Sequence, residues 1–216
     1  MVEKKSETIT LPPVIPVFPL NGVILIPGSN LPLNIFEPRY LQMVRDAATS
    51  NNLIGMIQPK SDDPTPDLYD VGAVGKIEDF TEVDENRFSI RLRGLARFSV
   101  IEELSATTPY RQVAADWHLF SDMNAAPEEA ILPRRELLAT LSDYLDFRGL
   151  DADFEAIAEA PDDVLVNTLS MVVPFDAPEK QALLEARSIA GRAQTLQTLL
   201  AMALIDVTSD TPTNLH

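Results

Sequence analysis

The 216-residue sequence contains no cysteine, so it can form neither a disulfide nor a thiolate metal site and has no cysteine nucleophile. It contains only two histidines, His118 and His216, which excludes zinc sites built on paired histidines. No apolar run reaches the roughly 18 residues that a membrane-spanning helix needs. Residues 1–10 also lack the apolar core of a secretory signal. We therefore expect a cytoplasmic protein with no membrane contact, no metal and no cofactor.

Basic residues are scarce, since 17 Lys and Arg stand against 33 Asp and Glu and give a net charge of −16. Nucleic-acid backbones are bound by basic surfaces, so this balance argues against nucleic acid as a partner. The acidity is uneven, because residues 121–216 hold 6 basic and 17 acidic groups. Hydrophobic residues make up 45% of the chain, which is typical of a globular protein.

The sequence pattern changes near residue 121. Short β-type runs separated by Pro and Gly precede this point, and Leu- and Ala-rich stretches with helical spacing follow it. The pattern predicts an α+β protein in four parts: a flexible N-terminal tail (1–11), a β-rich pseudo-barrel (12–121), a helical bundle (122–207) and a flexible C-terminal tail (208–216). The joint is expected at residues 121–127.

Six or so strands and one helix are expected in the first half, which is typical of a small barrel. The expected strands are 14–18, 23–26, 31–35, 53–58, a long hairpin from 71 to 100, and 110–120. The helix begins at Glu37-Pro38, because proline loses no hydrogen bond in a first turn. Further helices are expected at 133–148, 153–160, 162–173, 180–186 and 188–206, and Asp176 with Glu179 predicts a capping box before the fourth of these.

The long hairpin has a predicted register. A four-residue turn at 84–87 places Val83 opposite Phe88 and Thr81 opposite Ile90, which puts the apolar side chains on one face. Asp79 falls on that apolar face and indicates a bulge. The opposite face, which we call the arginine face, carries Arg87, Arg91, Arg93 and Arg97.

The sequence offers no convincing catalytic motif. Its single Gly-Lys pair, Gly75-Lys76, lacks the glycine and the hydroxyl residue of a phosphate-binding loop. The internal histidine, His118, alternates with Trp117 in an expected strand and is interpreted as structural. Acidic residues that are adjacent in sequence are interpreted as solvated charges or helix caps. We therefore expect a protein that is not an enzyme.

Two surface features leave binding open. The arginine face can receive carboxylates or phosphates, although neutralisation by Glu78, Glu82 and Asp84 across the hairpin is favoured. Apolar residues of the Pro-rich segment can form a peptide-binding patch, although core or edge packing is favoured there too. The candidate peptide-binding residues are Ile26, Pro27, Leu33, Phe36, Arg91 and Arg93.

Several segments, in order, resemble one known family. Residues 17–28 (Val-Phe-Pro-Leu-Asn-Gly-Val-Ile-Leu-Ile-Pro-Gly) and 31–40 (Leu-Pro-Leu-Asn-Ile-Phe-Glu-Pro-Arg-Tyr) are similar to the opening of the Lon protease N-terminal, substrate-binding domain. Residues 72–77 and 91–98 are similar to its central hairpin, residues 110–111 to the start of its last strand, and residues 179–185 to its late helix. The resemblance covers about residues 12–205; the family pattern has His where Asn34 stands here.

The resemblance implies a PUA-like, six-stranded pseudo-barrel followed by a helical bundle. It also implies a stand-alone member without the ATPase and Ser–Lys protease domains. The implied function is a non-catalytic protein- or peptide-binding module that acts as an adaptor or regulator in proteolysis or protein quality control. We expect a groove between barrel and bundle to supply its weak, multi-site contacts. Expected partners are unfolded or tagged protein segments, Lon or another protease, and a second copy in a homodimer. The alternative is a small-ligand or RNA-binding PUA-like protein that uses the arginine face.

Overall fold

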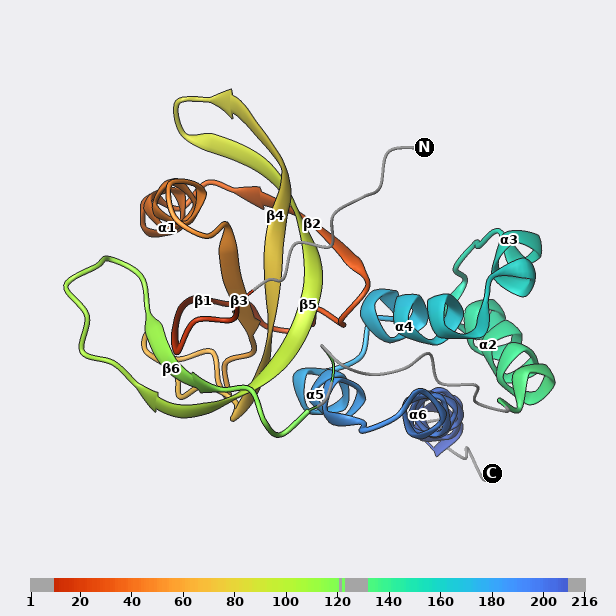
Figure 1. Ribbon diagram of the computed structural model, residues 1–216. Helices are drawn as coiled ribbons and strands as arrows, with labels where there is room; N and C mark the ends of the chain where they lie inside the picture. The colour runs from red at the N-terminus through yellow and green to blue at the C-terminus, as the bar shows by residue number, and fades with distance from the viewer. Residues whose placement is uncertain (1–9, 121, 123–131, 210–216) are drawn as a thin grey trace, which may run out of the picture.

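The sheet of the first half closes on itself. The computed structural model describes residues 10–120, 122 and 132–209. Its sheet order is β2-β5-β4-β3-β1-β6, and β5 also pairs with β6, which closes a small barrel (Figure 1). The strands are β1 (Val14–Pro19), β2 (Asn30–Ile35), β3 (Leu53–Ile57), β4 (Val71–Asp84), β5 (Arg87–Glu103) and β6 (Gln112–Asp116). The predicted six-stranded pseudo-barrel is therefore confirmed.

Helix α1 (Pro38–Ala48) is the single helix among the described residues of the barrel half, and it begins where the sequence predicted. Pro38 occupies the first turn, where its missing N–H removes no helical hydrogen bond. The helix buries Leu41 and Val44, and its Arg45 guanidinium lies 4.8 Å from the centre of the Phe88 ring. These contacts hold α1 against the barrel.

The expected strand at 23–26 is wrong, although the side chains of Ile24, Leu25 and Ile26 are buried. The segment runs between two turns that contain Gly22 and Gly28, both with positive φ, and it pairs with no strand among the described residues. Leu25 packs so closely on the sheet that a Cβ at Gly75 would lie 2.7 Å from Leu25 Cδ2. A Cβ at Gly94 would lie 2.4 Å from the carbonyl oxygen of Ile26. The segment is thus an extended connection seated on glycines of the sheet.

The β4–β5 hairpin differs from its predicted register by one residue. Ile90 faces Phe80 instead of Thr81, because the register shifts between positions 82 and 84. Val83, which was expected opposite Phe88 on the apolar face, is consequently 55% exposed. A further shift between positions 77 and 79 confirms the predicted irregularity near residue 79. Phe80 and Ile90 therefore share one face of the hairpin, with Ile90 buried and Phe80 exposed beyond the core.

The second half is helical, as predicted. Its elements are α2 (Arg134–Arg148), α3 (Phe154–Glu159), α4 (Asp162–Val172), α5 (Ala177–Glu185) and α6 (Ile189–Ser209). The predicted capping box is present, since the Asp176 and Glu179 side chains each accept a backbone N–H at the start of α5. The predicted tails and the joint at 121–127 lie largely outside the described residues.

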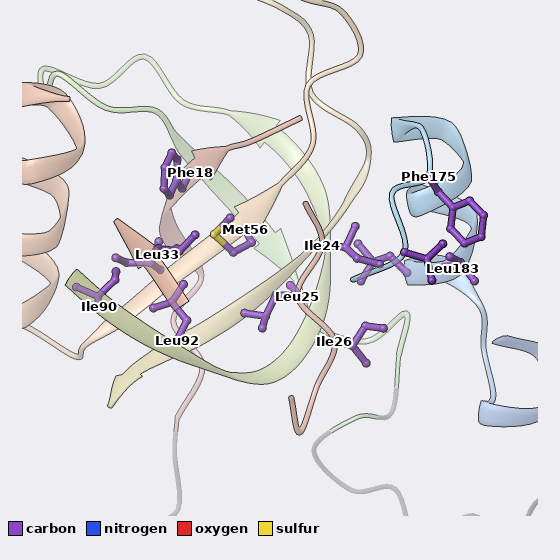
Figure 2. Packing of buried hydrophobic residues seen from close by; sticks show 14 of the residues in the cluster. Phe18, Ile24, Leu25, Ile26, Leu33, Met56, Ile90, Leu92, Phe175 and Leu183 are labelled. Atoms are coloured by element: carbon purple, nitrogen blue, oxygen red, sulfur yellow. The ribbon is translucent and has the colours of Figure 1, made fainter. Parts of the chain in front are cut away.

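One hydrophobic core runs through both halves. A single buried cluster includes Phe18 and Leu92 from the barrel with Leu183 and Leu196 from the helices. Figure 2 shows the extended connection at 23–26 between the barrel and the helices, with Leu25 on the side of the strands and Ile24 on the side of Leu183. None of the helices in the described ranges is long and apolar enough to cross a membrane.

Candidate functional site

Arg97, predicted on the exposed arginine face, is buried instead. Only 5% of the residue is exposed, because α5, Phe120 and Asp122 cover this part of β5. Its guanidinium makes a two-pronged ion pair with Asp122, with Nη2 to Oδ1 at 2.7 Å and Nε to Oδ2 at 2.9 Å. The same group donates to the carbonyl oxygens of Leu184 and Ala186 and lies 3.9 Å from the centre of the Phe120 ring. Arg97 is therefore a structural clasp between sheet and α5, unavailable to a ligand.

A second buried polar contact joins the same two parts. Gln58, at the end of β3, donates to the carbonyl oxygen of Ala177 at 2.9 Å and to the Gln181 side chain at 3.1 Å. Gln181 in turn donates to the carbonyl oxygen of Val71 at 3.0 Å. Both glutamines are at most 4% exposed. The junction between the sheet and α5 is consequently packed and hydrogen-bonded, so the groove expected between barrel and bundle is closed at this position.

The other three arginines remain at the surface but are engaged by acidic neighbours. Arg91 donates to Asp79 at 2.6 Å and to Glu78 at 2.9 Å, and these partners raise the pKa of Arg91. The Arg93 Nε lies 3.8 Å from the Glu78 Oε1. Arg87 pairs with Asp84 at 2.7 Å; its hydrogen bond to Asp84 is the main reason that the pKa of that carboxyl is lowered. Glu78 and Asp84 thus neutralise these three arginines within the hairpin, as the favoured interpretation expected, and Asp79 is a further partner. Glu82, the third acid of that interpretation, forms no ion pair among the described residues.

The candidate peptide-binding residues do not share one surface. Ile26 is 1% exposed and Leu33 is 9% exposed, and both pack into the core, which is the alternative that was favoured for the apolar residues of the Pro-rich segment. Pro27 is half-buried, whereas Phe36 is 65% exposed just after β2. Of the apolar candidates, Phe36 is therefore the one that a partner can reach most freely, and a peptide-binding role for these residues stays a prediction.

Three exposed apolar side chains belong to residues near the free end of the β2–β5–β4 section. They are Phe36, Phe80 and Val83, and we call them the hairpin-end residues; they are 65%, 45% and 55% exposed. Phe36 follows Ile35, which pairs with Phe88 in β5, and Phe88 in turn pairs with the β4 residue that precedes Val83. The Phe80 ring packs on Phe88 with ring centres 5.0 Å apart.

Sequence reasoning missed Phe80 and misplaced Val83, because both depend on the register. A strict two-residue alternation assigns Val83 to the buried face, and only the irregularity after position 82 moves it to the surface. The high charge of residues 78–85 was the available signal that this part of the hairpin is solvated.

The most perturbed buried group belongs to the bundle and not to a reaction centre. Lys180 is 1% exposed, and its ammonium donates to the carbonyl oxygens of Ser170 and Met171 at the end of α4. Burial lowers the pKa of Lys180 to about 8. The Ser170 hydroxyl donates to the carbonyl oxygen of Val166, so it is engaged in its own helix. The lysine thus caps a helix end.

The described residues hold no group of three or more His, Asp or Glu side chains positioned to bind a metal ion. Tyr110, whose hydroxyl donates to Asp46 at 2.7 Å, has its pKa raised to about 12, chiefly by burial and then by this hydrogen bond. It therefore stays protonated and acts as a structural contact between the start of β6 and α1.

The described residues form a closed barrel with helices docked on it, and Phe36, Phe80 and Val83 stay exposed at the free end of its sheet. Residues 14–202 match the family of the ATP-dependent protease La (LON) substrate-binding domain. The chain belongs to this family, which confirms the resemblance described from its sequence motifs.

Relatives and solved structures agree with this assignment. The chain is 27% identical to the Lon protease of Dictyoglomus thermophilum, in an alignment that covers 92% of this chain and 26% of that protein. It is 32% identical to Lon protease 2 of Myxococcus xanthus, in an alignment that covers 49% of this chain and 13% of that protein. It spans about a quarter of the first of these proteins.

Two solved structures share the fold. A Lon N-terminal domain protein from Xanthomonas campestris aligns with a TM-score of 0.58 and 24% identity, over 87% of this chain and 97% of that one. The N-terminal domain of the Mycobacterium avium complex Lon protease aligns with a TM-score of 0.60 and 18% identity, over 92% and 99%. They establish the architecture of a β-sheet part followed by helices.

Proposed function

We propose that this chain is a non-catalytic module that binds apolar segments of unfolded or tagged proteins. The observation that carries the proposal is the group of hairpin-end residues, Phe36, Phe80 and Val83, exposed on a member of a substrate-binding family. Exposed apolar groups on a folded protein mark interaction surfaces when they gather in one place. Weak contacts of this kind suit many different clients, because they select apolar character and not one shape.

The assignment as non-catalytic is supported by the chemistry of the buried polar groups. Lys180, the buried lysine, is committed to two carbonyls, and Arg97 is committed to Asp122. Neither side chain is left to activate a nucleophile or to stabilise an anion. The family description likewise names substrate binding.

The cellular role that follows is an adaptor or regulator in proteolysis or protein quality control. A module that holds apolar segments without processing them can deliver them to a protease or compete with it for them. The proposed partners are therefore unfolded or tagged segments and Lon or another protease, and self-association into a homodimer would double the binding surface.

The test measures whether the purified chain suppresses aggregation of chemically denatured client proteins without ATP, followed by light scattering. We expect suppression at a modest molar excess, weakened by Phe36→Ser. Phe147→Ser is the matched control, since Phe147 is 44% exposed on α2, away from the hairpin end. Failure to suppress aggregation of several clients, together with no binding to a permanently unfolded one, would overturn the proposal.

A salt titration separates this function from its alternative, RNA or small-anion binding by the arginine face. Phosphate contacts weaken steeply as salt rises, whereas apolar contacts do not. Arg97 is buried, and Arg91 is held by two carboxylates, so we expect client binding to persist at high salt. Tight RNA binding that salt abolishes would instead support the alternative.

A further inference from the structure

The distal half of β4 is a free strand edge. β4 has 14 residues, but β3 pairs only with its positions 73–76. From position 79 onward, β4 pairs with β5 on one side, and no described strand pairs with its other side. Figure 1 shows this part of the hairpin extending beyond the barrel. Every residue from Glu78 to Asp84 is exposed.

This edge is also regular, in contrast to the other edge of the sheet. β2 carries Pro32 at its centre, and proline lacks the N–H that a new strand would need. Between Asp79 and Glu82, β4 keeps one register with β5, and positions 77–86 contain neither proline nor glycine. A regular free edge offers alternating N–H and C=O groups to an added strand.

The side chains along this edge define what can be added. Glu78 and Asp79 are held by Arg91 from the β5 side, but Glu82 has no ion pair among the described residues. Phe80 lies two positions from Glu82, on the same side of the strand, and is 45% exposed. Residues directly opposite in paired strands interact, and like charges there are destabilising. A second copy of this acidic strand is therefore disfavoured as the occupant.

We propose that the β4 edge at Asp79–Glu82 binds an extended protein segment by strand addition, and that the segment places a basic residue opposite Glu82 and an apolar residue opposite Phe80. This rests on the proposed function and names its substrate class: apolar segments with a lysine or arginine two residues from an apolar side chain. The main chain supplies affinity, and Glu82 with Phe80 supplies the selection.

The experiment uses a fluorescent peptide with the core Lys-Val-Ile-Thr between Ser-Gly flanks, and measures binding to the full chain by anisotropy. Two further peptides of the same sequence carry N-methyl groups on alternate backbone amides. One peptide is methylated on the first alternating set of amides, and the other on the complementary set. Because only every second amide of an added strand faces its neighbour, we expect one set to weaken binding about tenfold and the other to leave it nearly unchanged. Equal effects of both sets would refute strand addition.

The charge selection is tested by Glu82→Lys, with Glu85→Lys as the matched control in the turn outside the regular edge. We expect Glu82→Lys to weaken the lysine peptide about fivefold and to strengthen a Glu-Val-Ile-Thr peptide, while Glu85→Lys changes both far less. No peptide binding up to about 1 mM, or equal affinity for both peptides, would overturn the inference. Client binding that persists in that case would leave the proposed function standing. A dimer whose formation excludes the peptide would assign the edge to a second copy instead.

Discussion

Replacing Arg97 by leucine tests whether the clasp holds the helices on the sheet. The substitution leaves Asp122, whose side chain is 11% exposed, without its guanidinium partner, and it removes the donors to the Leu184 and Ala186 carbonyls. Breaking a buried ion pair by removing one member costs about 3–5 kcal/mol, because a desolvated charge is left uncompensated. Since whole domains are stable by only about 5–15 kcal/mol, this loss is large.

Urea unfolding monitored by two probes measures the effect. Trp117 is the only tryptophan and packs on Phe98, so its fluorescence reports the barrel, whereas far-ultraviolet circular dichroism is dominated by the helices. We expect Arg97→Leu to lower the unfolding free energy by about 4 kcal/mol and to separate the two transitions. Arg97→Lys keeps the charge but loses the two-pronged geometry, so its unfolding free energy should lie between those of the wild type and Arg97→Leu.

A double-mutant cycle completes the test. Because leucine at position 122 removes the stranded carboxylate, the Arg97→Leu/Asp122→Leu protein should be more stable than Arg97→Leu alone, with a coupling of about 2 kcal/mol or more. A loss below about 1 kcal/mol for Arg97→Leu, with coincident transitions and no coupling, would refute the clasp.

Three further substitutions probe other parts of the fold. Lys180→Met removes a buried lysine whose pKa is about 8 in the folded protein against an ordinary 10.5, so between these values the wild type releases a proton on folding and the variant does not. The unfolding free energy of the wild type should therefore rise by about 2 kcal/mol relative to that of the variant from about pH 7 to about pH 9.5, as measured by urea unfolding at each pH. A pH-independent difference would contradict the burial of a charged lysine. Gly94→Ala places a Cβ 2.4 Å from the Ile26 carbonyl oxygen and should cost at least about 2 kcal/mol in thermal unfolding, and a neutral result would show that the connection can move away. Asp176→Ala removes the capping box of α5 and should cost about 1 kcal/mol by the same measurement, while an unchanged stability would mean that packing alone fixes the start of that helix.

The elements that the sequence predicted well are those whose signals are local. The start of α1 at Pro38, the cap at Asp176 and the end of α2 at Arg148, before Gly149 with φ of 62°, each depend on a few neighbouring residues. The strand expected at 23–26 failed because an apolar run reports burial and not strand pairing. Its side chains are buried by the sheet and the helices together, which no short window of sequence contains.

The candidate site was harder to predict because it depends on how distant segments meet. Arg97 follows the same two-residue alternation as Arg91 and Arg93. It is buried, whereas they are exposed, because α5 and Asp122 cover it. Ile26 and Leu33 were correctly identified as apolar, but their exposure depends on the barrel that closes around them. Surface and interior are properties of the assembled fold, so sequence alternation alone assigns them poorly.

The molecule places its specific polar contacts and its exposed apolar groups at different positions. At the junction, Gln58, Gln181 and Arg97 bind backbone carbonyls at fixed places, so α5 can dock in only one register, whereas purely apolar faces would tolerate sliding. The hairpin end has the opposite character, with half-exposed Phe80 beside an open strand edge. Because the edge shares no partner with the clasp, peptide binding should be as tight to a folded Asp122→Asn variant as to the wild type, even where that variant is less stable. A loss of peptide binding in parallel with stability would mean instead that the docked helices shape the binding edge.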